Sequence, residues 1–159
     1  MLRASVTVFY GLIFHEEGSD AEFGDVIWGP LDRDEVHCTD EAAVSAGELL
    51  GATKPAVPFN NRDPKVFALY QAWWAEARRK LEESGCTFVR YGDMTDMTLV
   101  RWGVAVATSL HQTESFTFAL ALDAEKLVVQ ATWNEMLRKF CDTVGIAWRE
   151  PQWHIGASD

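Results

Sequence analysis

Residues 5–14 are rich in β-branched and aromatic side chains, and both alternating faces of the segment are apolar. Two apolar faces are typical of a strand in the middle of a sheet that is covered on both sides. The segment therefore predicts a central strand. A glycine inside a strand commonly marks a bulge or a close approach of another backbone, and we expect one of these at Gly11.

A helical period is clearest over residues 64–84, where apolar side chains recur every three or four positions. Asp63 before this segment is typical of a helix start, and Gly85 after it is typical of a helix end. Adjacent helical residues point about 100° apart. We therefore expect one of Trp73 and Trp74 to lie in the core, and the other at the core edge or at a partner surface.

The other periodic segments complete the predicted fold. We expect helices over residues 41–50 and 124–144, a polar loop over 111–114, and strands around 25–28 and over 86–91, 99–110, 116–122 and 146–155. This order predicts one α+β domain over residues 1–159. Its mixed sheet of about four or five strands, with two long helices and one short helix, would form two layers.

Charge is distributed unevenly along the chain. Residues 1–50 hold 11 acids against 2 bases, a net charge of −9, whereas the other 109 residues have a net charge of −1. An acidic excursion over residues 15–50 contains Arg33 as its one base. Such a field repels nucleic acid and attracts basic surfaces. The candidate partner-binding residues are the acids Glu16, Glu17, Asp20, Glu22, Asp25, Asp32, Asp34 and Glu35.

The sequence offers little support for a metal, a cofactor or catalysis. The three cysteines are far apart and lack the close pairs of structural zinc sites, so we expect reduced thiols and no bound metal. Neither a phosphate-binding glycine loop nor a nucleophile elbow occurs, and we expect no cofactor. An alternative is a small-molecule or nucleotide-binding protein or an enzyme with a pocket over the sheet, lined by Tyr91, Asp93, Trp102 and His111.

Several short features follow one another along the chain in the same order as in one group of proteins. They are Tyr10-Gly11, Ser84-Gly85-Cys86, Gly92-Asp93, Ala105-Val106-Ala107, Phe140-Cys141 before Gly145-Ile146, and Trp153. In these features the chain resembles a class of small phage and bacterial α+β proteins that carry no established activity. The likeness covers the C-terminal half and the first strand and leaves out the acidic segment. It implies a phage or mobile element in a bacterial cell, and it transfers no functional residues.

Together these observations predict a non-catalytic, acidic interaction protein of the bacterial cytoplasm. We expect it to be phage-encoded and to inhibit or modulate a host protein by occupying a basic, nucleic-acid-binding surface. It should not bind nucleic acid itself, and no apolar stretch reaches the ~20 residues of a membrane span. A self-associating assembly protein, in the simplest case a homodimer, is a further alternative.

Overall fold

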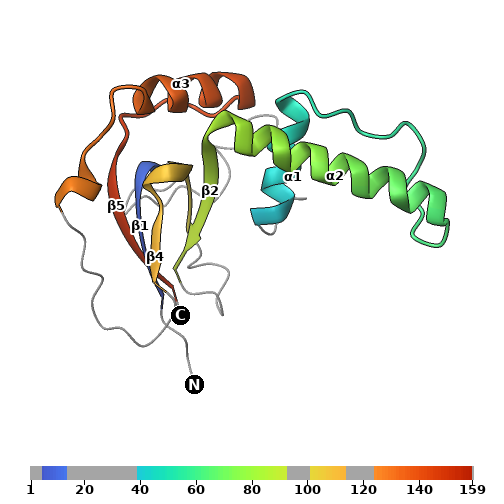
Figure 1. Ribbon diagram of the computed structural model, residues 1–159, viewed down its shortest axis with the longest axis horizontal. Helices are drawn as coiled ribbons and strands as arrows, with labels where there is room; N and C mark the ends of the chain where they lie inside the picture. Colours follow the sequence, from blue (N-terminus) through green and yellow to red (C-terminus); the bar gives the residue numbers. More distant parts are fainter. Residues whose placement is uncertain (1–4, 14–38, 93–100, 114–123, 159) are drawn as a thin grey trace.

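The computed structural model describes residues 5–13, 39–92, 101–113 and 124–158 of the chain. Within them, helices lie on one side of a curved antiparallel sheet, which confirms the α+β class (Figure 1). In chain order the elements are β1 (Ser5–Ile13), α1 (Thr39–Leu49), α2 (Pro64–Ser84), β2 (Cys86–Tyr91), β3 (Arg101–Val106), the 3-10 turn η1 (Ala107–Ser109), β4 (His111–Thr113), the 3-10 turn η2 (Ala124–Leu127), α3 (Trp133–Val144) and β5 (Gln152–Ser158).

The first strand lies at the centre of the sheet, as its two apolar faces predict. It pairs with β5 along one edge and with β3 and β4 along the other, and β2 pairs with β3. Every described pair is antiparallel, whereas a mixed sheet was expected. Hydrophobic periodicity could not settle this point, because the period of two is the same in parallel and antiparallel strands.

The predicted strand over 99–110 is interrupted. Gly11 pairs with Ala105 and Val6 pairs with Thr113. The two residues of β1 are five positions apart in the chain, whereas their two partners are eight positions apart. The three extra residues are the 3-10 turn η1. After this turn the chain pairs with β1 again and forms β4. The prediction of a loop over 111–114 is therefore wrong for residues 111–113, which form a strand.

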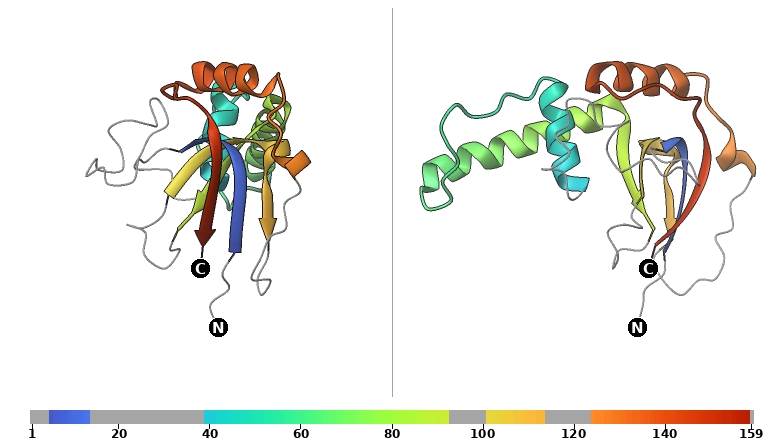
Figure 2. Two further views of the ribbon diagram at one scale, coloured as in Figure 1. Left: turned by 90° about the vertical axis from the view of Figure 1, so that its left-hand side faces the viewer. Right: turned by 180° about the vertical axis from the view of Figure 1, so that it is seen from behind.

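The two outer strands meet at one end of the sheet. The backbone N–H of Gly92, directly after β2, donates to the carbonyl oxygen of Ala157 in β5 at 2.8 Å. A side chain at Gly156 would overlap the ring of Tyr91, so glycine permits this approach. The sheet is therefore curled, and its strands converge at this end in two views (Figures 1 and 2).

The inner, concave face of the curl holds a small apolar cluster of Phe9, Val89 and Ala105. Gly11 and Gly103 lie on the same face, and a Cβ on either would overlap the backbone of the opposite strand. This is the close backbone approach expected at Gly11. His154 of β5 also lies on this face, with its ring centroid 5.2 Å from that of Phe9 and its Nε2 3.2 Å from the Gly11 carbonyl oxygen.

The outer, convex face carries the main core. Tyr10, Leu12, Trp102 and Val104 from the sheet pack there against the buried side of α3. The rings of Tyr10, Trp133 and Trp153 form a triangle with centroid separations of 5.6, 5.6 and 6.1 Å. Among the described residues, the cluster on this face holds more buried side chains than either of the other two, so this face contributes most of the core.

The helix expected over 124–144 begins later, at Trp133. Its buried positions are Trp133, Leu137, Phe140, Cys141 and Val144. Continuing that stripe toward the N-terminus would place the polar Gln130 and Lys126 on the same side. The apolar face thus ends at Trp133, and the preceding residues Val128 and Val129 are exposed β-branched residues that favour helix poorly.

The last strand also differs from its expected bounds of 146–155, since β5 runs from Gln152 to Ser158. Pro151 has no N–H to donate to a ladder, and pairing with β1 begins at the next residue. Ile146 and Trp148 instead pack on the main core. The strands expected around 25–28 and over 116–122 lie outside the described residues.

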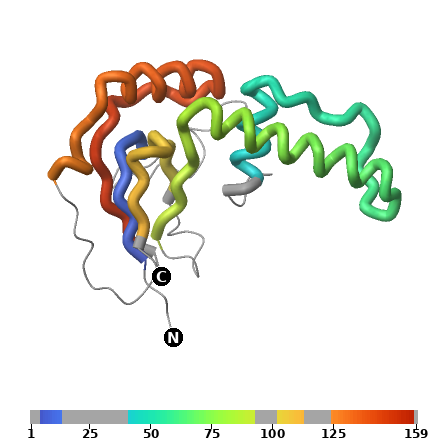
Figure 3. The backbone as a smooth tube through the Cα atoms, viewed as in Figure 1, coloured from blue at the N-terminus to red at the C-terminus, as the bar shows by residue number. Residues whose placement is uncertain are grey.

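The long helix α2 and the loop before it form an arm that projects beyond the sheet (Figure 3). The Asp63 carboxylate accepts hydrogen bonds from the N–H groups of Lys65 and Val66, and Gly85 ends the helix in the left-handed conformation with φ 72°. These are the helix start and stop that the sequence predicts. The helix is about 30 Å long, at 1.5 Å per residue.

Candidate functional site

Helices α1 and α2 and the loop that joins them enclose a groove of about 410 Å³. One wall comes from α1, through residues at spacings of three, four and seven: Glu41, Val44, Ser45 and Glu48. This spacing places all four on one face of a helix. The groove therefore has a wall with a carboxylate at either end, about 10 Å apart along the helix axis.

The floor of the groove is aromatic. Trp73 is only 8% exposed and belongs to the cluster that joins α2 to the loop, whereas Trp74 is half-buried. This confirms that one tryptophan lies in the core and the other at its edge. The Lys54 ammonium lies 5.5 Å from the centre of the Trp73 ring, within the range of a cation–π contact.

Two bases also line the groove. Lys54 comes from the loop and Arg78 from α2, both exposed. The groove lining thus combines two acids, two bases and two tryptophans. The sequence drew attention to the tryptophan pair and to the acids of residues 1–50. It gave no signal that Lys54 or Arg78 lines a groove, because only the tertiary structure brings the loop and α2 to α1.

Apolar surface continues from the groove toward the end of the arm. Phe59 is 49% exposed, and its ring lies 5.9 Å from Trp74 and 5.0 Å from Tyr70. The Tyr70 hydroxyl donates to the Val57 carbonyl oxygen at 2.9 Å, which fastens the loop to the helix. A rigid aromatic surface of this kind is typical of binding sites, where aromatic residues are enriched.

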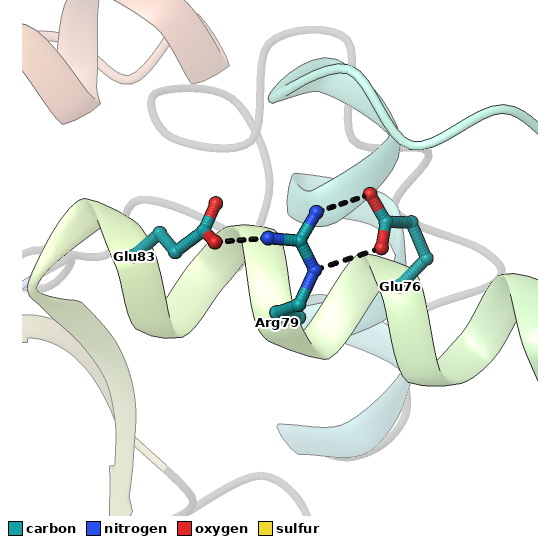
Figure 4. A network of polar contacts seen from close by, with 3 residues as sticks. All are labelled: Glu76, Arg79 and Glu83. Atoms are coloured by element: carbon teal, nitrogen blue, oxygen red, sulfur yellow. Dashed lines mark hydrogen bonds and ion pairs between the residues drawn. The ribbon is translucent and has the colours of Figure 1, made fainter.

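The opposite side of α2 is held by ion pairs (Figure 4). The Arg79 guanidinium donates to both carboxylate oxygens of Glu76, at 2.6 and 2.9 Å, and also to Glu83. Its hydrogen bond lowers the pKa of Glu76 below the usual value. These groups are solvent-exposed and helix-spaced, which is typical of a solvated helix face and not of a binding site.

The structure does not bring the alternative pocket residues together. Tyr91 lies on the concave face of the sheet, and Trp102 is 2% exposed in the convex core, with Arg90 5.7 Å above its ring. Side chains on opposite faces of a sheet cannot line one pocket. His111 is half-buried on β4 opposite Val8. Asp93 lies outside the described residues, as do all eight proposed partner-binding acids from Glu16 to Glu35.

The described part of the chain contains no candidate for a reactive cysteine or a metal site. Cys86 and Cys141 are free and buried in the main core, and burial raises the pKa of their thiols to about 12 and about 11. The thiolate is the reactive form, so both thiols are inert near neutral pH. Among the described residues, His, Cys, Asp and Glu form no group of three that could hold a metal ion. Cys38 and His37 lie outside these residues.

Comparisons with known proteins find no family model, curated protein or solved structure that matches the chain. None of the described helices is long and apolar enough to cross a membrane. The groove between α1 and α2 is therefore described by its own residues alone, which are two tryptophans, two acids, two bases, a valine and a serine.

Proposed function

We propose that this protein acts by binding a basic surface of another protein through its acid-rich N-terminal region. The observation that carries the proposal is the charge asymmetry, −9 over residues 1–50 against −1 over the remainder. Like charges gathered in one segment repel one another and reduce stability. A basic partner surface relieves that repulsion, because the carboxylates then lie where the partner would otherwise bind phosphates.

The described end of this region supports the proposal. Glu41 and Glu48 are exposed on α1, so the acidic field extends onto a rigid helix that is packed against α2. In this proposal the protein is phage-encoded and acts in the cytoplasm of a bacterial host. It inhibits or modulates a host protein whose surface normally binds nucleic acid.

Affinity capture from a host lysate tests the proposal. The bait is the full chain, compared with a variant in which Glu16, Glu17 and Glu22 become Gln and Asp20 becomes Asn. A control variant removes four exposed charges elsewhere, at Glu82, Glu125, Glu135 and Asp142, by the same type of change. Captured proteins are identified by mass spectrometry at about 50 mM and about 200 mM salt, a range over which contacts that replace phosphates weaken strongly.

The wild type and the control variant should retain a basic, nucleic-acid-binding host protein at low salt and lose it at high salt. The neutralised variant should retain much less, because it attracts the partner more slowly. Equal capture by both variants, with the same salt dependence, would show that the acids only solvate the surface. A gel-shift assay should show no binding of DNA by the protein itself, because its field has the wrong sign.

A further inference from the structure

We propose that the groove between α1 and α2 binds a small zwitterion, a ligand with one ammonium and one carboxylate group on an apolar body, as in an apolar amino acid or a dipeptide. The charged residues of the lining select this chemistry. Glu41 and Arg78 are engaged in interactions of their own. Glu48 and Lys54 are exposed, and among the described residues neither forms an ion pair. The groove thus offers a ligand one carboxylate and one ammonium group.

These two charges occupy different places in one groove, because Glu48 and Lys54 form no salt bridge with each other. A ligand with only an ammonium group would pair with Glu48 and leave Lys54 partly desolvated without a partner, and a ligand with only a carboxylate would do the reverse. A zwitterion pairs with both groups. Its zero net charge also matches a lining of two acids and two bases.

The lining also contains a hydrogen-bond donor that lacks an acceptor. Trp73 is 8% exposed, and its indole N–H is buried without a hydrogen-bond partner. Folded proteins rarely leave such a donor unpaired, and the exceptions call for an explanation such as an absent water or ion. The Lys54 ammonium lies 5.5 Å from the centre of the same indole ring. A carboxylate bound by Lys54 therefore brings an acceptor to this part of the groove.

The apolar body of the ligand would lie against Val44 and the tryptophans. Trp74 is half-buried, and its ring centre lies 5.9, 6.3 and 6.2 Å from those of Phe59, Phe67 and Tyr70, which hold it in place. A small-molecule site is typically apolar and aromatic with a few polar groups, and has a volume of roughly 300–1,000 Å³. The groove, at about 410 Å³, is near the lower limit and favours a ligand of one or two amino-acid units.

The groove is preformed. Helix α1 crosses α2 at Gly47 and Ala77, where a Cβ on Gly47 would overlap the Ala77 backbone (Figure 1). The Ala52 N–H donates to the Gly47 carbonyl oxygen at 2.9 Å, which ties the start of the loop to α1 two residues before Lys54. A site that is already ordered binds a small ligand without the entropic cost of assembling it.

Ligands that share an aromatic body and differ in their charged groups test the proposal. L-phenylalanine and alanyl-phenylalanine carry both charges, phenethylamine lacks the carboxylate, and 3-phenylpropionate lacks the ammonium group. Each is titrated over about 0.1–20 mM into the isotope-labelled full chain, and the indole N–H resonances of the tryptophans are followed by NMR. The variants Trp73→Phe and Trp74→Phe assign the two resonances of the groove.

At least one of the two zwitterions should shift the Trp73 and Trp74 resonances to saturation. The one that binds more tightly identifies the ligand as a single amino acid or a dipeptide. Each ligand with a single charge should bind about tenfold or more weakly, because it lacks one hydrogen bond between charged groups.

Removing one charge of the groove should remove one of these preferences. In Glu48→Gln, phenylalanine should lose most of its advantage over 3-phenylpropionate, and in Lys54→Gln most of its advantage over phenethylamine. Glu82→Gln and Lys65→Gln are matched controls at exposed positions of α2 that do not line the groove, and both should behave as the wild type does. Circular dichroism confirms that each variant is folded.

The absence of a saturable shift with either zwitterion would overturn the proposal. So would a single-charge ligand that binds as tightly as phenylalanine, which would indicate a site for a cation or an anion alone, or preferences that persist in both groove variants. The ligand comparison on the wild type decides the matter even should a variant unfold. The result does not depend on the acids at residues 16–22, because they do not line the groove.

Discussion

The hydroxyl oxygen of Ser109 accepts a hydrogen bond from the backbone N–H of Tyr10 at 2.9 Å, although 99 residues separate the two in the chain. Ser109 is completely buried, and its hydroxyl donates to the Val106 carbonyl oxygen at 2.7 Å. The turn η1 carries the backbone of β3 away from β1 at this point, so a side chain replaces the missing ladder partner. A buried backbone N–H is nearly always paired, and here a serine pairs it.

Replacing Ser109 by Ala should lower the free energy of unfolding by about 1–3 kcal/mol, because the buried Tyr10 N–H then has no acceptor. Urea denaturation measures the change. Thr108→Ala, an exposed change in the same turn, is the control and should stay within about 0.5 kcal/mol of wild type. Equal effects of the two changes would mean that the turn, and not the hydroxyl, stabilises this part of the sheet.

Gly11 should tolerate no side chain. A Cβ at this position would overlap the carbonyl oxygen of Val104, and both groups are backbone that cannot rotate away. Gly11→Ala is therefore expected to prevent folding or to leave an aggregated product. Gly51→Ala provides the comparison, because a Cβ there meets open space and only the positive φ of 105° opposes it, at a cost of about 1–2 kcal/mol. A well-folded Gly11→Ala variant with native stability would contradict the close approach of β1 and β3.

Trp73 and Trp74 should respond differently to truncation. Trp73→Ala removes a side chain that is 8% exposed and leaves a cavity beside Tyr70 and Ala77, so it should cost about 3–5 kcal/mol. Trp74→Ala should cost less than half of this, since Trp74 is only half-buried. Chemical denaturation of both variants gives the comparison. Similar losses would be inconsistent with the orientation of α2.

His154 should make stability depend on pH. Burial against Phe9 lowers the pKa of its imidazole, although the hydrogen bond to the Gly11 carbonyl partly opposes the shift. A carbonyl oxygen only accepts, so Nε2 carries the proton in the neutral ring. The unfolded chain takes up a proton near pH 6.5, and the folded chain does so only at lower pH. Stability conferred by the neutral ring is thus present above about pH 6.5 and is lost as the pH falls below it.

Thermal unfolding between pH 7.5 and 5.5 measures this slope. The wild type should lose stability over the interval, and His154→Gln, which has no titrating group at this position, should lose less. A slope that is unchanged in His154→Gln would assign the pH dependence to other groups.

Local rules allow several elements to be predicted from the sequence alone. The helix α2 begins at Asp63 and Pro64 and ends at Gly85, because capping and backbone conformation depend on residues within one turn. The central position of β1 follows from its two apolar faces. One part of the prediction that failed is also instructive. The helix expected over 124–144 begins only at Trp133, because the buried stripe of α3 starts there.

Only the tertiary structure determines the features that depend on contacts between residues far apart in the chain. Strand direction, the three-residue turn between β3 and β4, and the meeting of Gly92 with Ala157 depend on which strands lie side by side. The groove follows the same rule, because its acids come from α1 and its bases from the loop and α2. By itself the sequence determined the class of the fold, the helix boundaries of α2 and the uneven charge. Only folding determined which residues line the groove, because this depends on distances between segments that local periodicity does not encode.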